Sequence, residues 1–347
     1  MRRVGGCPSV GAIMPDQTPR ARRTADGVFS GGGVKGLAFA GALTGAERFG
    51  YSDWHELAGT SAGAITAMAL AAGYDAGSLR SSLDKFDFSS LADYGSPIHL
   101  LGGIRDLVLH ESLVKGDALT DWIRSLLADA PGGGLDPDVT FAELQRSRGR
   151  TLVVVGTDLA HGRIVAFPQD LALYLDGRGE AVDAASFPVY EAVRISAGYP
   201  YFFPPLGGLQ DRHSKKPGVF VDGGVGSAFP LYIFDKPEPK HPTWGFHLHA
   251  GNDPSETDPS HHDIGGVGWP VQMLEAILDT SVNALDKFEQ RRFLGRVIPI
   301  PTGAVSTLNF NLNAQEKDEL FQSGLKAATS FFENPPAPPE NSYGRTP

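Results

Sequence analysis

The sequence predicts an α/β protein with a buried central sheet. Short apolar segments that run into glycine alternate with helical segments, which is the pattern of βα units. Residues 151–157 form a continuous apolar run, as expected for a strand buried on both faces. Ser61 lies in a G-x-S-x-G pentapeptide between a predicted strand and a predicted helix. At 347 residues the chain has room for one large domain or two modest ones.

The composition excludes several classes of protein. The chain is 41% hydrophobic and 20% charged, as in folded globular proteins, and its net charge of −10 argues against a nucleic-acid binder. That charge gives no global attraction to anionic membranes, so a lipid contact would have to be local and apolar. With one cysteine, Cys7, there is no disulfide framework and no thiolate metal site. We expect no metal and no cofactor, because no group of His, Asp or Glu shows ligand spacing along the sequence.

The chain ends differ in composition from the middle. Residues 1–25 mix Arg, Gly and Pro without the apolar core of a signal peptide, so we expect a disordered leader. Residues 334–347 are proline-rich and predict a disordered tail. Between them, residues 26–333 form the expected domain, with no apolar stretch long enough to span a membrane. We therefore expect a cytoplasmic protein or one exported without a signal peptide; the sequence does not fix the oligomeric state.

A glycine run follows the first predicted strand. The strand covers residues 27–30 and leads into the glycine-rich residues 31–36, and a helix follows over residues 37–49. Backbone N–H groups in such a turn point at an anion. The phosphate-loop pattern is absent and the dinucleotide fingerprint is poor. The run is better interpreted as an oxyanion hole, in which glycines let a substrate approach the backbone.

Ser61 has the local sequence of a nucleophile elbow. A serine on a tight strand-to-helix turn has a strained backbone, so its neighbours Gly59 and Gly63 are residues without a Cβ. The helix after it, residues 62–72, is rich in small residues and ends at Gly73. A small-residue turn of any α/β protein is the alternative for the pentapeptide alone. The glycine run one βα unit earlier favours the catalytic interpretation.

The next segment is less regular. Helices are predicted over residues 78–86 and 118–127, and Thr140 is expected to cap a short helix. Between the first two lies Asp87–Lys115, in which apolar residues alternate with glycines. This segment is either a helical excursion that completes the core or a lid or lipid-facing surface.

The second half of the chain supplies a candidate base. A strand over residues 163–167 and a helix over residues 189–195 precede Ser196–Pro205, a proline- and aromatic-rich loop that either walls an apolar pocket or is a rigid connection. A strand over residues 218–221 then leads to Asp222, at the end of a strand where α/β active sites collect. A turn aspartate bonded to its own backbone is the alternative. The remaining predicted elements are strands over residues 243–249 and 297–300 and helices over residues 270–294 and 314–332.

Two arrangements could activate the serine. In a triad, Asp222 would orient a histidine such as His247, His249 or His262. In a dyad, the aspartate takes the serine proton itself. An α/β-hydrolase elbow usually follows several strands, whereas here one strand and one helix precede Ser61, which favours the dyad.

Four ordered motifs together resemble the patatin-like phospholipase family, over about residues 26–332. They are Gly31-Gly32-Gly33-Val34-Lys35-Gly36, Gly59-Thr60-Ser61-Ala62-Gly63, the Ser196–Pro205 loop and Asp222-Gly223-Gly224. The resemblance implies a three-layer α/β/α fold with a central, mostly parallel sheet. It also implies a Ser-Asp dyad, with Ser61 as the nucleophile and Asp222 as the base.

The resemblance assigns the remaining motif residues as well. The amides of Gly31, Gly32, Gly33 and Val34 would form the oxyanion hole, with Lys35, Gly36, Gly59, Gly63, Gly223 and Gly224 supporting the motifs. Lys35 would meet a phosphate headgroup, form a structural salt bridge or be a solvated side chain. The chain departs from the pattern at Ala228, where many members have an asparagine before the Phe-Pro pair.

The expected function is hydrolysis of acyl esters in phospholipids or lysophospholipids through an acyl-enzyme. The expected partner is a phospholipid or other acyl-ester lipid, reached through peripheral membrane contact. One alternative is a serine esterase or thioesterase acting on soluble substrates. The other is a non-catalytic lipid-binding protein, against which the intact Ser61, Asp222 and glycine run argue.

Overall fold

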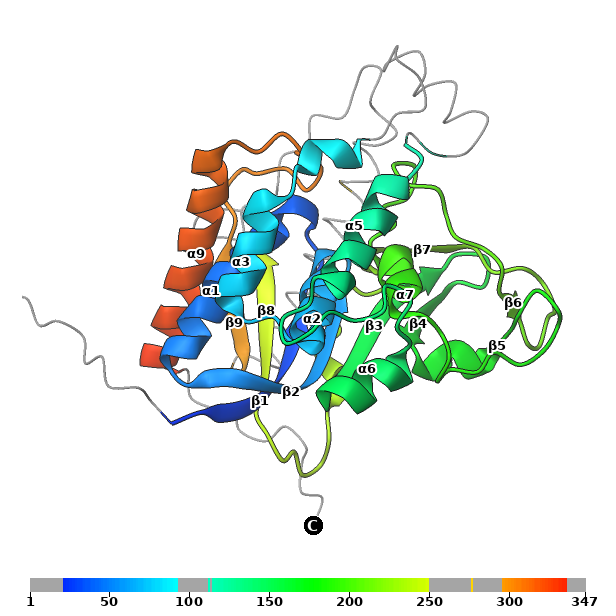
Figure 1. The fold of residues 1–347 in the computed structure, drawn as a ribbon, viewed down its shortest axis with the longest axis horizontal. Coiled ribbons are helices and arrows are strands. Elements are labelled where there is room, and N and C mark those ends of the chain that lie inside the picture. Colours follow the sequence, from blue (N-terminus) through cyan, green and yellow to red (C-terminus); the bar gives the residue numbers. More distant parts are fainter. Residues whose placement is uncertain (1–20, 93–111, 113, 250–275, 277–294, 336–347) are drawn as a thin grey trace, which may run out of the picture.

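The computed structural model describes residues 21–92, 112, 114–249, 276 and 295–335. It confirms the α/β fold with a central, mostly parallel sheet (Figure 1). Several predicted features lie outside the described residues: most of the predicted helix over residues 270–294, His262, most of Asp87–Lys115, residues 1–20 of the expected leader and residues 336–347 of the expected tail.

The sheet has five parallel strands and two antiparallel ones. Its members are β1 (Arg23–Phe29), β2 (Tyr51–Thr60), β3 (Thr151–Asp158), β4 (Arg163–Phe167), β7 (Phe220–Asp222), β8 (Thr243–His249) and β9 (Val297–Pro301). The order is β4-β3-β2-β1-β8-β9, and β7 also pairs with β3. Both β4 and β7 run antiparallel to β3. The parallel strands β1, β2 and β3 therefore end at one edge, here called the carboxyl edge.

The first strand begins earlier than predicted. β1 starts at Arg23, so residues 23–25, expected in the leader, are part of the sheet. Thr24 donates a hydrogen bond to Asp53 on β2 (Oγ1–Oδ2, 2.9 Å), and Asp26 accepts one from the Glu56 amide (3.0 Å). These side-chain contacts extend the pairing of β1 with β2 beyond the apolar residues from which the strand was predicted.

The long helices pack on one face of the sheet. They are α1 (Leu37–Arg48), α2 (Ala62–Ala72), α3 (Ala76–Lys85), α5 (Asp117–Ala128), α6 (Phe141–Arg148), α7 (Val189–Ser196) and α9 (Ala314–Glu333). Their bounds agree with the predicted helices to within about two residues, and Thr140 caps α6 as expected. Strand residues Phe29, Trp54 and Phe246 join them in one apolar core. None of the described helices is long and apolar enough to cross a membrane.

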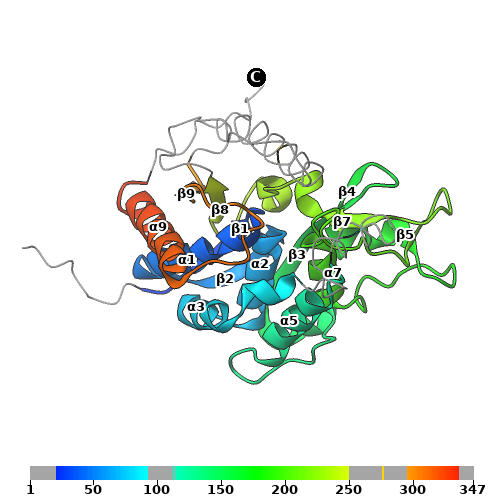
Figure 2. The same cartoon turned by 90° about the horizontal axis from the view of Figure 1, so that it is seen from above.

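The opposite face is covered, within the described residues, by a short segment. Phe229, Leu231 and Phe234 pack there against Val28 and other strand residues. Leu231 and Phe234 belong to η5 (Leu231–Phe234), which Figure 2 shows on the side of the sheet away from α3 and α5. The remaining short elements are η1 (Gly33–Gly36), η2 (Phe88–Leu91), η3 (Gln169–Leu173), β5 (Tyr174–Leu175), β6 (Gln210–Asp211) and η4 (Gly223–Val225).

Candidate active site

Ser61 and Asp222 lie together because the carboxyl ends of β2 and β7 meet beside β3. Thr60, the last residue of β2, pairs with Val155, and Asp222, the last residue of β7, pairs with Gly156. β4 pairs with the same β3 residues from the opposite side, so β2 and β7 both lie on the other side of β3. The two strands run in opposite directions, so Ser61, which follows β2, lies next to Asp222, which ends β7.

Asp222 is the last residue of its strand, as expected. That strand, β7, is antiparallel to β3 and three residues long. Asp222 reaches the carboxyl edge because β7 runs inward from beyond that edge and stops beside Val155 and Gly156. Strand direction is a tertiary property, and nothing in residues 218–222 encodes it.

The elbow holds Ser61 in a conformation that few non-glycine residues adopt. Its φ of 55° and ψ of −123° carry strain, which the surrounding contacts offset. Its amide donates to the hydroxyl of Ser196 (2.9 Å), which donates to the Val155 carbonyl (2.5 Å). A Cβ on Gly63 would overlap the carbonyl oxygens of Phe29 and Ser30, which explains that glycine sterically.

The Ser61 hydroxyl donates a hydrogen bond directly to Asp222 (Oγ–Oδ2, 2.8 Å). The other carboxylate oxygen of Asp222 accepts from the Gly224 amide (2.7 Å), and the residue is 3% exposed. Burial raises the pKa of Asp222 from 3.8 to about 6, although the hydrogen bonds from Gly224 and Ser61 act in the opposite direction. The carboxylate is therefore a stronger base than an exposed aspartate, yet it is mostly ionised at neutral pH.

The direct contact favours a dyad over a triad. No described histidine lies between Ser61 and Asp222. His247 is buried on β8 and packs against the ring of Phe229, with ring centroids 5.1 Å apart. His249 lies on the same strand, and neither residue lines the cavity at Ser61.

The four amides expected at an oxyanion hole differ in their hydrogen bonds. The Gly31 amide donates to the carbonyl of Ala228 (2.8 Å) and the Val34 amide to that of Thr307 (3.2 Å), so both are engaged in the fold. Within the described part of the chain, Gly32 and Gly33 amides donate no hydrogen bond. Ala228, where the sequence departs from the family pattern, therefore contacts the glycine run through its backbone carbonyl.

The run lies close to the serine. A Cβ at Gly31 would be 3.6 Å from the Ser61 Cβ, and one at Gly36 would be 2.8 Å from the Ala62 Cβ. Gly33 has a φ of 55°, and a side chain there would overlap the carbonyl of Thr307.

The other supporting residues have structural reasons for their identity. A Cβ on Gly59 would overlap the Gly63 carbonyl, and one on Gly223 would overlap the Val155 carbonyl. Lys35 is buried in η1, forms no ion pair with any described residue, and does not line the cavity at Ser61. Among the described residues, the contacts of Lys35 do not include the structural salt bridge, and its burial argues against a solvated side chain.

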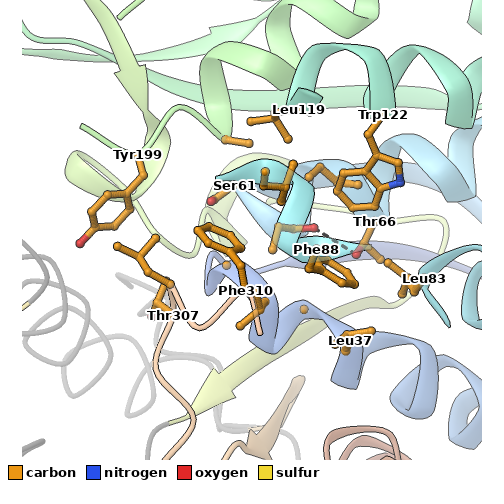
Figure 3. A pocket seen from close by; sticks show the side chains of 18 of the residues that line it. Leu37, Ser61, Thr66, Leu83, Phe88, Leu119, Trp122, Tyr199, Thr307 and Phe310 are labelled. Atoms are coloured by element: carbon orange, nitrogen blue, oxygen red, sulfur yellow. Dashed lines mark hydrogen bonds between the residues drawn. The ribbon is translucent and has the colours of Figure 1, made fainter. Parts of the chain in front are cut away.

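Ser61 and Asp222 line an apolar cavity whose empty space, together with the open solvent at its mouth, is about 720 Å³. Figure 3 shows Leu37, Leu83, Phe88, Leu119, Trp122 and Phe310 around it. The walls come from α3, η2, α5 and the segment 307–310, which is far from Ser61 in the sequence. Such a lining accepts hydrocarbon and offers few polar partners.

Two sequence interpretations bear on these walls. Tyr199 and Phe203 line the cavity, so the Ser196–Pro205 loop does wall an apolar pocket. Phe88 and Leu91, at the start of Asp87–Lys115, line it as well. The contribution of α5 was not predicted, although its strong apolar face, which includes Leu119, was the signal for it.

Three potential metal ligands lie close together among the described residues. Asp26, His55 and Glu56 each offer a ligand atom within 4.8 Å of the others. The sequence did not reveal the group because Asp26 joins it only through the pairing of β1 with β2. Lys236 forms an ion pair with Glu56. Glu56 precedes Thr60 by four residues, about 13 Å along β2, so this group does not reach the serine.

Comparisons with known proteins show what the chain as a whole is similar to. A sequence profile described as patatin-like phospholipase matches residues 27–235. The protein YqhO of Bacillus subtilis is 33% identical over 311 residues, covering 88% of this chain and 97% of that protein. A protein of Acanthamoeba polyphaga mimivirus is 25% identical over 310 residues, covering 86% and 90%. The crystal structure of VipD from Legionella pneumophila superposes with a TM-score of 0.54 at 15% identity, over 92% of this chain and 72% of that one, a similarity of fold.

Proposed function

Because this chain belongs to the patatin-like phospholipase family, we propose that it hydrolyses the acyl esters of lipids with Ser61 as nucleophile and Asp222 as general base. One observation carries the proposal: the 2.8 Å hydrogen bond from the Ser61 hydroxyl to a buried carboxylate that lines an apolar cavity. Family membership supports a lipid hydrolase in general, and the hydrogen bond supports the dyad.

In the first step, the Ser61 oxygen attacks the ester carbonyl carbon while its proton passes to Asp222. The carbonyl oxygen becomes an oxyanion, which needs donors that are already in place. The amides of Gly32 and Gly33 are the candidates, because those of Gly31 and Val34 are engaged. Collapse of the tetrahedral intermediate breaks the bond to the alcohol, which leaves with the proton from Asp222.

In the second step, water hydrolyses the acyl-enzyme. Asp222 takes a proton from the water, whose oxygen attacks the acyl carbon, and Ser61 regains its proton as the fatty acid leaves. Both steps need Asp222 ionised at their start. A pKa of about 6 permits this at neutral pH and gives the carboxylate more proton affinity than an exposed aspartate has.

The cavity supports an acyl chain as the group held at Ser61. Leu79, Leu83, Leu119 and Trp122 offer hydrocarbon and aromatic surface, and each methylene buried contributes about 0.8 kcal/mol. A phospholipid or lysophospholipid substrate fits this lining. Soluble esters or thioesters with short acyl groups would contact less of this apolar lining.

Fatty-acid release distinguishes the proposed function from its alternatives. We would compare release from phosphatidylcholine and lysophosphatidylcholine vesicles with hydrolysis of p-nitrophenyl butyrate, using wild type, Ser61→Ala and Asp222→Asn. A lipid hydrolase turns over the vesicles and loses that turnover in both variants. Turnover of butyrate alone would indicate a soluble esterase, and lipid binding without turnover of either would indicate a binding protein; both outcomes contradict the proposal.

A further inference from the structure

Three exposed apolar side chains gather at the carboxyl edge of the sheet. Leu159, Ile164 and Val219 are 46%, 39% and 38% exposed. The Leu159 amide donates to the Val219 carbonyl (2.9 Å), so these two residues are direct neighbours. Ile164 pairs with Thr157 across β3 and β4, and Thr157 pairs with Val221 of β7. Side chains alternate along strands, so Ile164 lies on the face opposite the long helices. Leu159 directly follows β3 and Val219 directly precedes β7, at the same end of the sheet.

A basic turn lies beside them. Residues 211–216 form a tight turn in which Arg212, Lys215 and Lys216 are exposed. Asp211 contributes little free negative charge, because its carboxylate accepts from the His213 and Ser214 amides (3.0 and 2.5 Å) and pairs with Arg163 (2.7 Å). The turn is therefore locally cationic in a chain of net charge −10.

Side-chain contacts hold the basic and apolar residues together. His161, in the turn after Leu159, contacts the Ser214 hydroxyl through Nε2 (3.1 Å) and the buried Asp158 carboxylate through Nδ1 (2.8 Å). Asp158 also accepts from the Tyr174 hydroxyl (2.8 Å). We call the six residues Leu159, Ile164, Val219, Arg212, Lys215 and Lys216 the basic–apolar rim.

The rim stands at the same edge of the sheet as the candidate active site. β3 continues three residues past Val155, the partner of Thr60, which carries the turn at Leu159 about 10 Å beyond the level of Ser61. Val219 precedes Asp222 by three residues on the chain that forms β7. Tyr201, 49% exposed, follows the cavity residue Tyr199 by two positions.

We propose that the basic–apolar rim is the surface by which this protein docks on membranes that contain anionic phospholipids. The apolar side chains enter the interfacial layer, and each cation near an anionic surface contributes about 1 kcal/mol of attraction. The remaining negative charge of the protein is repelled, so the attraction also orients the carboxyl edge, with Ser61, toward the lipid. The inference extends the proposed function by naming its lipid surface.

Vesicle flotation tests the rim directly. The protein is used as Ser61→Ala so that lipid is not consumed, with vesicles of phosphatidylcholine alone or mixed with phosphatidylserine. We expect binding to the mixed vesicles that weakens with salt. Lys215→Glu with Lys216→Glu should lower it about tenfold or more, and Leu159→Ser with Val219→Ser should lower binding to both vesicle types.

Matched controls separate the rim from general charge and exposure. The variant Lys240→Glu with Arg146→Glu makes the same charge change at two exposed residues that precede β8 and β3, at the end of the sheet opposite the rim. Tyr232→Ser removes a similarly exposed side chain from η5. Both should float like the parent protein. Circular dichroism checks the folding of every variant, and the two lysine substitutions keep the test valid if the Leu159 and Val219 variant does not fold.

Two results would overturn the inference: no flotation of the parent protein, or rim variants that float like it. The exposed surface would then suit a protein partner instead. Failure of the proposed function is a separate observation, made with wild-type Ser61 on p-nitrophenyl butyrate and lipid substrates. Butyrate hydrolysis should be unchanged in the rim variants, because none of these residues lines the cavity.

Discussion

Removing the hydroxyl of Ser196 should slow the chemistry without emptying the cavity. Ser196 is fully buried at the end of α7, where its oxygen accepts from the Ser61 amide and donates to the Val155 carbonyl. Ser196→Ala leaves both backbone groups without this partner. A buried polar group left unsatisfied costs about 1–3 kcal/mol, and here the loss falls on the strained residue that carries the proposed nucleophile.

The same free energy predicts a rate effect. If the elbow relaxes in the variant, 1–3 kcal/mol of lost preorganisation lowers kcat by about 5- to 150-fold. KM should change little, because Ser196 does not line the cavity. We would measure kcat and KM on a soluble ester and the rate of fluorophosphonate labelling at a temperature where the variant is folded.

A hydroxyl removed elsewhere provides the control. Thr44 on α1 donates to the Ala40 carbonyl (2.8 Å) away from the cavity, so Thr44→Ala should affect stability alone. Ser196→Cys, which keeps a weak donor and acceptor, should recover part of the rate. A Ser196→Ala protein with a lowered Tm but unchanged kcat and labelling rate would refute the reasoning, since Ser196 would then stabilise the fold without positioning Ser61.

Three further predictions follow from the site. As pH falls through about 6, Asp222 gains a proton and can no longer accept one from Ser61, so kcat/KM should fall with an apparent pKa near that value. A kcat/KM that stays constant down to pH 4.5 would contradict the assignment of Asp222 as the base. Leu119→Trp should remove room for about two methylenes and so lower the ratio of palmitate to butyrate ester hydrolysis about 15-fold, whereas the surface variant Leu173→Trp should not. A chelator should leave ester hydrolysis unchanged, because the potential metal ligands at Asp26 do not reach the serine; lost activity would show a metal requirement.

The glycine motifs made much of the site predictable. Ser61 needs Gly63 because a Cβ there would collide with carbonyl oxygens of Phe29 and Ser30, and this local requirement is visible as G-x-S-x-G. The βα pattern likewise indicated the sheet and most helices, since apolar runs and small-residue helices form their elements locally. The order of the motifs along the chain then paired Ser61 with Asp222.

Features that depend on distant contacts were not visible in the sequence. The Gly31 amide is engaged by the Ala228 carbonyl, a contact about 200 residues away along the chain. Ser196 supports Ser61 only because α7 packs against β3, and the antiparallel course of β7 depends on its partner strand. The cavity walls from α5 and residues 307–310 also required the assembled fold.

Intact mass after treatment with a fluorophosphonate probe tests the Ser61–Asp222 dyad most directly. We predict one adduct on the wild type, none on Ser61→Ala, and strongly slowed labelling of Asp222→Asn, whose neutral amide no longer accepts the serine proton. Peptide mapping should place the adduct on Ser61. Labelling that persists in Ser61→Ala, or that proceeds at the wild-type rate in Asp222→Asn, would contradict the dyad.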